Sequence, residues 1–133
     1  MKENVRTLLR WVFGLAFIAA GINHFVNEDF YVAIMPPYLP WHEALVQLSG
    51  VIEILVGAAV LIPRLRPHSG WAAVATLLAV FPANVHMALH AEDFPDIPVY
   101  GLWVRLPLQL VMIAWAIWAT RPPHAPSIPA TAE

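Results

Sequence analysis

Four apolar stretches, each about 20 residues long, constrain what this chain can fold into. They cover residues 8–26, 41–62, 71–90 and 101–119. A helix of about 20 residues spans the roughly 30 Å hydrocarbon core of a bilayer. An open sheet cannot satisfy its backbone hydrogen bonds in lipid, and four strands are too few to close a barrel. We therefore predict an all-α membrane protein with four helical spans.

The charges between these stretches alternate in sign along the chain. Six of the seven Lys and Arg residues lie before or at the start of the first stretch, within the connection 61–70 or after the fourth stretch. Six of the nine Asp and Glu residues lie in or beside the other two connections. Cytoplasmic connections are enriched in Lys and Arg, so both termini and the connection 61–70 are predicted to be cytoplasmic. Short connections predict an antiparallel four-helix transmembrane bundle over residues 1–120.

Composition narrows the class of protein further. Hydrophobic residues make up 59% of the chain and charged residues 12%, against about 45–50% and about 25% in soluble domains. There is no cysteine, so thiol exchange, iron–sulfur ligation and covalent haem attachment would have to belong to a partner. No basic face is present to meet phosphates, and we expect the lipid bilayer rather than nucleic acid as a partner.

Three segments flank or join the spans. The first stretch begins like a signal peptide, but its apolar run is longer than a signal core, and we expect it to be retained. The connection 27–40 is predicted to be a stiff, non-helical cap, because its prolines lack backbone donors and fix φ. Residues 121–133 are rich in Pro and Ala and are predicted to form a flexible cytoplasmic tail.

Glu53 is the most informative polar residue within the spans. A charge near mid-bilayer costs about 2.5–3.5 kcal/mol, so Glu53 is expected to face the bundle and to be protonated or paired. With Arg10 assigned to the cytoplasmic edge of the first span, Arg105 is the one cation inside the spans and is its expected partner. Gly50 and Gly57 share the face of Glu53, where small residues let a helix or a ligand come close. The pair is either a structural contact or a functional site.

Two further positions suit an oxygen-bearing ligand. Arg105 and Gln109 are four residues apart on one helical face, and their donors match a quinone carbonyl or a small oxyanion. Arg105 could instead reach outward to lipid headgroups. Asn84 follows Pro82 and either bonds the carbonyl that this proline frees or points a donor at a ligand.

The histidines inside the spans offer less specific signals. His24 lies near the outer end of the first span, where it is a candidate proton carrier beside Glu53. His86 and His90 are separated by four residues, a spacing that allows two imidazoles to share a metal ion. They are weak metal candidates, and we otherwise expect no metal site.

Several short motifs give the chain a family resemblance. They are AGINHF at 20–25, MPPYLP at 35–40, SGVIE at 49–53, FPANVHMA at 81–88 and RLPLQ at 105–109. Over about residues 8–120 the chain resembles the DoxX and DoxX-like family of small four-span bacterial membrane proteins. The family name comes from a subunit of archaeal thiosulfate:quinone oxidoreductases. The resemblance implies an inner (plasma) membrane location and a ligand site formed by His24, Glu53, Asn84, Arg105 and Gln109.

Three hypotheses about function follow. The first is a redox-associated subunit that binds a quinone or small polar ligand in an outward-facing intramembrane pocket, with Glu53 or His24 as the catalytic candidate and a redox protein as partner. If it is an enzyme, it is an oxidoreductase subunit without thiol chemistry of its own. The second is a small-solute binding or transport protein, for which a homo-oligomer is expected. The third is a non-catalytic membrane scaffold held together by Glu53 and Arg105.

Overall fold

The computed structural model describes residues 2–121, and this part of the chain is entirely helical outside its connections. The predicted tail beyond Arg121 lies outside the described residues. Four of the helices are long and apolar enough to cross a membrane, which confirms the prediction of an all-α chain with four candidate spans. The elements in chain order are α1 (Lys2–Val26), α2 (Glu28–Ala33), α3 (His42–Leu61), α4 (Arg66–Leu89), η1 (Ala91–Asp93) and α5 (Val99–Thr120).

The helices differ from the apolar stretches mainly at their beginnings. α1 begins at Lys2 and α4 at Arg66, each several residues ahead of the corresponding apolar stretch. Polar residues can continue a helix beyond the apolar part, and a proline in the first turn of α4 is compatible with its geometry. The non-helical cap predicted for 27–40 is wrong for its first half, which contains α2. In this region only Asn27 and the proline-rich residues 34–41 are non-helical.

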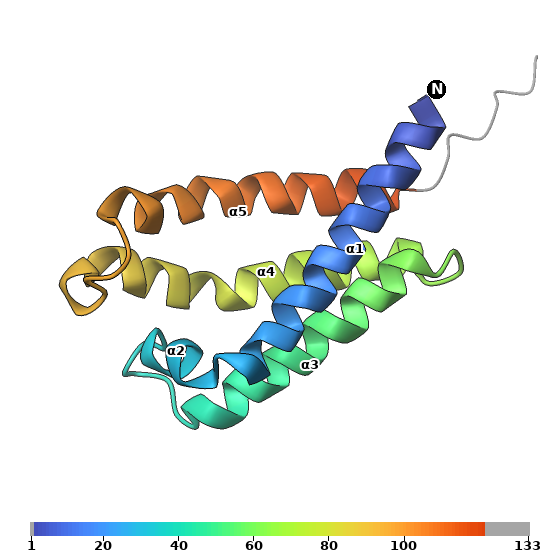
Figure 1. The fold of residues 1–133 in the computed structure, drawn as a ribbon. Helices are drawn as coiled ribbons and strands as arrows, with labels where there is room; N and C mark the ends of the chain where they lie inside the picture. Colours follow the sequence, from blue (N-terminus) through green and yellow to red (C-terminus); the bar gives the residue numbers. More distant parts are fainter. Residues whose placement is uncertain (1, 122–133) are drawn as a thin grey trace, which may run out of the picture.

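The long helices form two pairs. α1 packs along α3, α4 packs along α5, and α3 and α4 join the pairs. Figure 1 shows the α1–α3 pair crossing the α4–α5 pair obliquely, so that the two pairs are close at the end where the chain begins and diverge toward α2. The molecule therefore has a closed end and an open end, and we use these two names below.

Glycines bring α1 and α3 together along their length. A β-carbon added at Gly21 would lie 2.5 Å from the carbonyl oxygen of Gly50, and one added at Gly57 would lie 2.6 Å from that of Gly14. The sequence predicted a close neighbour for Gly50 and Gly57, and the structure shows that this neighbour is the glycine face of α1. Backbones this close leave no room for any side chain between them.

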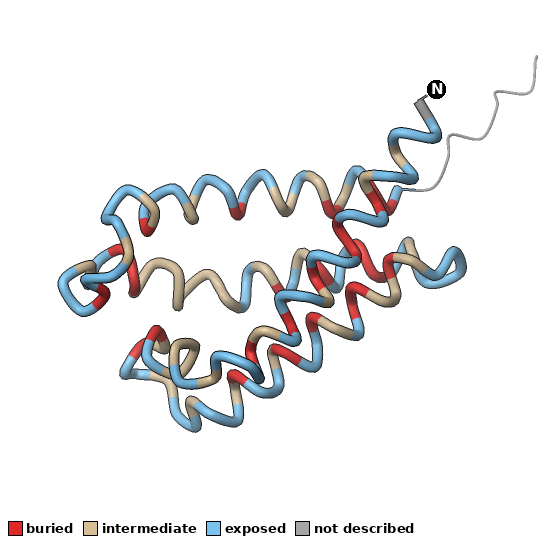
Figure 2. The backbone as a smooth tube through the Cα atoms, viewed as in Figure 1, coloured by how far each residue is buried: buried red, intermediate tan, exposed pale blue. Residues whose placement is uncertain are grey.

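Two apolar clusters fill the two ends unequally. The closed end holds a core built from Phe13, Phe17, Val56, Val60, Ala73 and Ala116. A second cluster lies where the segment after α2 meets α4, η1 and α5, and comprises Ile34, Met87, Ala88, Phe94 and Leu102. Figure 2 shows buried residues concentrated where α1 and α3 meet α4 and α5, while much of α4 toward the open end is only intermediate in burial. Packing is therefore tight at the closed end and looser at the open end.

Two arginines tie the closed end. Arg10 is buried and its Nε donates a 2.9 Å hydrogen bond to the carbonyl of Ala119. Arg6 donates through Nη2 to the carbonyls of Trp118, at 2.9 Å, and of Arg121. The last carbonyls of a helix have no partner within that helix, and α1 supplies their donors here. From the sequence these arginines were interpreted only as markers of the cytoplasmic side.

Candidate functional site

A cavity of about 480 Å³ lies at the open end, bounded by all four long helices and by α2 with the segment after it. Most of its lining is aliphatic or aromatic, as is typical of sites for small organic ligands. Four of the five predicted ligand residues line it, namely His24, Glu53, Asn84 and Arg105. The remaining polar lining residues are Asn23, Tyr31 and Ser49.

Glu53 and His24 face each other on the α1–α3 wall of the cavity. His24 Nε2 lies 3.6 Å from Glu53 Oε2, and both side chains are more than nine-tenths buried. Within residues 2–121, Glu53 Oε2 has no hydrogen-bond partner. Gly50 makes this approach feasible, because a β-carbon there would lie 2.8 Å from His24 Cβ. A buried carboxyl oxygen without a donor is costly, which makes this wall a candidate for ligand binding.

The predicted pair between Glu53 and Arg105 is wrong. Within the described residues, the basic side chain beside Glu53 is His24 instead, whose ring is charged only when it is protonated. Arg105 is half-buried on the opposite wall, where its Nη1 lies 3.7 Å from Met87 Sδ. The two charges belong to different helix pairs, and the cavity separates them. Thioether sulfur is a weak acceptor, so the guanidinium retains unused donors at the cavity.

His24 is held by contacts on two sides. Its Nδ1 lies 3.0 Å from the carbonyl oxygen of Val46 and 3.0 Å from Ser49 Oγ. Its ring stacks on Tyr31 with centroids 3.9 Å apart and an interplanar angle of 26°. Asn23 Nδ2 donates to the Tyr31 hydroxyl at 2.9 Å. These contacts fix the plane of the imidazole ring.

Tyr31 was not predicted as a site residue. The sequence places it among the aromatic residues of a connection, and no spacing rule links it to His24. Only the folding of α2 back over α1 brings the two rings together, and α2 itself was not predicted.

Asn84 and Gln109 form a pair between α4 and α5. Asn84 Nδ2 donates to Gln109 Oε1 at 2.9 Å, and Gln109 Nε2 donates to the carbonyl of Leu77. Gln109 is buried and does not line the cavity, so its structural role is to orient Asn84. The alternative prediction was a hydrogen bond from Asn84 to the carbonyl that Pro82 frees. In the structure, Asn84 donates to Gln109 instead.

His86 and His90 lie outside the cavity. Their ring centroids are 4.2 Å apart, and Nδ1 of His90 lies 3.0 Å from the carbonyl of His86. No group of three or more His, Asp or Glu side chains arranged for a metal ion occurs between residues 2 and 121. The pair therefore lacks the additional ligands that a protein metal site normally has.

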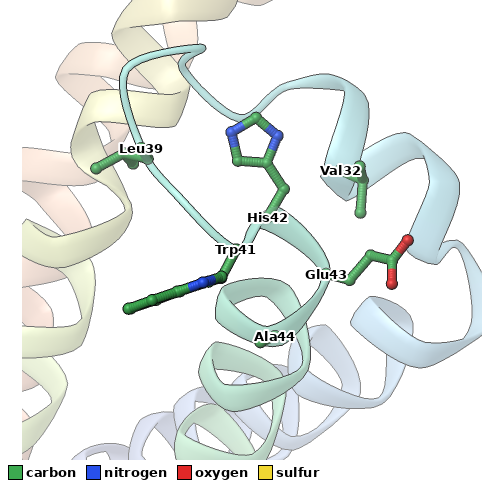
Figure 3. A pocket seen from close by; sticks show the side chains of 6 residues that line it. All are labelled: Val32, Leu39, Trp41, His42, Glu43 and Ala44. Atoms are coloured by element: carbon green, nitrogen blue, oxygen red, sulfur yellow. The ribbon is translucent and has the colours of Figure 1, made fainter.

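A second hollow, of about 540 Å³, lies on the outside of the α2–α3 connection. Figure 3 shows its lining side chains, among which the Trp41 indole points away from His42 and Glu43. His42 Nε2 lies 3.2 Å from the carbonyl of Pro36, and Trp41 has a φ of 52° and an exposed fraction of 80%. None of the predicted site residues lines this hollow.

Fold and site together define an all-helical protein with four candidate membrane spans and a partly polar cavity between its helix pairs. The chain belongs to the family described as a domain of unknown function, DUF8561, whose model matches residues 13–120. No curated protein and no solved structure matches the chain. The family match covers all five predicted ligand residues and adds no activity to them.

Proposed function

We propose that this chain is a DoxX-like integral protein of the bacterial inner membrane, folded as an antiparallel four-helix transmembrane bundle. No more than a third of the most apolar window of any of the four long helices is buried inside the protein. So much exposed apolar surface suits lipid rather than water. The alternation of charge along the sequence supports an orientation with both termini and the closed end in the cytoplasm, and with the open end and its cavity outside. Exposed aromatic residues such as Trp41 and Tyr100, near the open end, suit the outer interface.

Its proposed function is to bind a quinone, or a small ligand with similar oxygens, as a redox-associated subunit. The observation that carries the proposal is the buried Glu53 oxygen without a donor, in a cavity whose other wall presents Arg105. The acid and the cation face one cavity without contacting each other. Each therefore has hydrogen-bonding capacity that a ligand can use.

A quinone matches the cavity in shape and in chemistry. Its ring and chain are apolar, as is most of the cavity lining. Its two carbonyl oxygens lie at opposite ends of the ring, so one can accept from Arg105 or Asn84 while the other meets the wall of Glu53 and His24. Because the chain has no cysteine, electrons would come from a partner protein.

The test has two stages on protein purified gently in detergent. Native mass spectrometry and solvent extraction first identify any quinone or other molecule that copurifies. Titration with decylubiquinone then compares wild type with Glu53→Gln and Arg105→Ala. We expect each variant to bind at least about tenfold more weakly, since each loses a contact worth about 1.5–3 kcal/mol to a charged group.

Glu92→Gln provides the matched control, because it removes the same charge from an exposed residue near the open end. It should bind like wild type. If neither Glu53→Gln nor Arg105→Ala weakens binding while both remain folded, the cavity is not a quinone site. A loss of thermal stability without any loss of binding would instead favour the scaffold hypothesis, with His24 and Glu53 as a structural pair.

A further inference from the structure

The contacts of His24 determine which of its ring nitrogens carries hydrogen. The Val46 carbonyl oxygen, 3.0 Å from Nδ1, can only accept a hydrogen bond. Ser49 Oγ donates its own hydrogen to that same carbonyl, at 3.0 Å, and so is not available to donate to Nδ1. An unprotonated Nδ1 would place its lone pair against that of the carbonyl. Nδ1 is therefore the protonated nitrogen, which leaves Nε2 for Glu53.

The contact between Nε2 and Glu53 then requires a proton of its own. A neutral imidazole protonated at Nδ1 has a bare lone pair at Nε2, and an ionised carboxylate presents lone pairs as well. Two such acceptors, 3.6 Å apart and buried, would repel each other. One proton between them removes the conflict, either as imidazolium with carboxylate or as imidazole with carboxylic acid.

We infer that His24 and Glu53 form a one-proton dyad, and that its shared proton is the hydrogen-bond donor for an oxygen of the ligand. The inference deepens the proposed function and rests on it. The separation of 3.6 Å exceeds the 2.7–3.2 Å of an ordinary hydrogen bond, so the two side chains do not use the proton fully between themselves. A ligand oxygen in the cavity completes the arrangement, and no covalent bond is made or broken.

The surroundings of the dyad support this role. Tyr31 on α2 stacks on the imidazole, Ser49 on α3 bonds the same carbonyl as His24, and Asn84 on α4 lines the cavity. Arg105 on α5 is the other charged residue of the lining. Its positive charge favours a ligand oxygen that carries negative charge, which is also the better acceptor for the proton of the dyad.

The first experiment examines the protein without ligand. Nitrogen-15 NMR of the full chain, labelled at its six histidines, is compared with His24→Gln to assign the His24 signals. We expect Nδ1 of His24 to be protonated across the neutral pH range. A His24 protonated at Nε2 with an unprotonated Nδ1 would overturn the inference. Because this measurement uses wild type, it does not depend on the folding of a Glu53 variant.

The second experiment measures decylubiquinone affinity against pH. The protonated dyad is the donor, so binding should weaken as pH rises through the titration of the dyad, by up to about tenfold per pH unit for one proton. In Glu53→Gln the amide donates to Nε2 permanently, and the weaker binding should be independent of pH. Glu92→Gln should keep the wild-type profile.

The outcomes separate the two proposals. Binding that is lost in Glu53→Gln but shows no pH dependence in wild type overturns the dyad and leaves the proposed function standing. Absence of any quinone binding overturns the proposed function, and with it the role of the dyad as donor to the ligand. A wild-type profile that persists in Glu53→Gln assigns the titration to another group and also overturns the dyad.

Discussion

The closed end and the open end of the molecule use their charged side chains differently. At the closed end Arg6 and Arg10 donate to the last carbonyls of α5 beside an apolar core, and the atoms there without a partner among residues 2–121 are the donors Arg6 Nε and Trp115 Nε1, which do not line the cavity. At the open end Glu53 Oε2 has no donor within residues 2–121, and Arg105 has only a sulfur acceptor. A charged side chain that has hydrogen-bond partners stabilises the fold. One without partners on a cavity wall can gain them from a ligand. The difference suggests that stability and function are separated along the length of the helices.

The largest effect on stability is expected at the glycine contact between α1 and α3, on which both ends of the molecule depend. Gly21→Ala puts a β-carbon 2.5 Å from the Gly50 carbonyl oxygen and 2.9 Å from the Ile54 backbone nitrogen, so α1 and α3 must separate. We expect the free energy of unfolding to fall by about 3 kcal/mol, the upper part of the range for overpacking. Thermal unfolding in detergent, followed by circular dichroism, measures the change.

The chain offers a control of the same chemistry. At Gly101 in α5, the nearest atom to an added β-carbon is 3.9 Å away. Alanine in a helix is normally more stable than glycine by about 0.5–1 kcal/mol, so Gly101→Ala should be neutral or stabilising. Equal melting temperatures for the two alanine variants would show that the glycine contact between α1 and α3 is not close.

The next effect tests the closed end alone. Arg10→Ala leaves the Ala119 carbonyl without its donor and should lower the free energy of unfolding by about 2 kcal/mol, as for a hydrogen bond to a charged group. Arg64→Ala removes the same charge from an exposed position and should change stability little. Thermal unfolding gives both values. If Arg10→Ala weakened decylubiquinone binding while the protein stayed folded, the separation between the two ends would be incorrect.

The sequence predicted the number and type of the long helices because apolar length alone determines them. It also identified four of the seven polar residues that line the cavity, since a polar group such as Glu53 or Asn84 within a span must face the interior of the protein. It failed on the partner of Glu53. The cost of a charge in lipid predicts that Glu53 faces the bundle interior, but the oblique crossing of the helix pairs decides which side chains it meets there. No one-dimensional pattern contains that angle.

Contacts between elements that are far apart in sequence explain the other failures. α2 is stabilised by contacts of Phe30 and Tyr31 with the cluster that joins Ile34 to the ends of α4 and α5, which lie far away in sequence. From the sequence, Arg6 and Arg10 were interpreted only as markers of the cytoplasmic side. A sequence does not distinguish an arginine that faces headgroups from one that caps a distant helix. Each missed feature is a contact between elements rather than a property of one element.

A smaller effect is expected from the pair behind the cavity wall. Gln109→Ala removes the acceptor of Asn84 Nδ2 and the donor to Leu77, but leaves the cavity lining intact. We expect decylubiquinone to bind about fivefold more weakly, because the lost orientation of Asn84 corresponds to one neutral hydrogen bond of about 1 kcal/mol. Titration of the variant, alongside Asn84→Ala, measures this. An additive loss in the double variant would contradict the idea that Gln109 acts through Asn84.

The smallest effect separates the ring of Tyr31 from its hydroxyl. Tyr31→Phe keeps the stacking on His24 and removes only the hydroxyl oxygen that accepts from Asn23. That hydrogen bond is half-buried and lies beside the cavity. We expect a change in decylubiquinone affinity of less than about twofold, since the bond is neutral and partly solvated. Tyr31→Ala, which removes the ring, should weaken binding more than Tyr31→Phe and shift the His24 nitrogen signals. If the two variants behaved alike, the hydroxyl and not the ring would orient His24, and the open end would depend on a hydrogen bond as the closed end does.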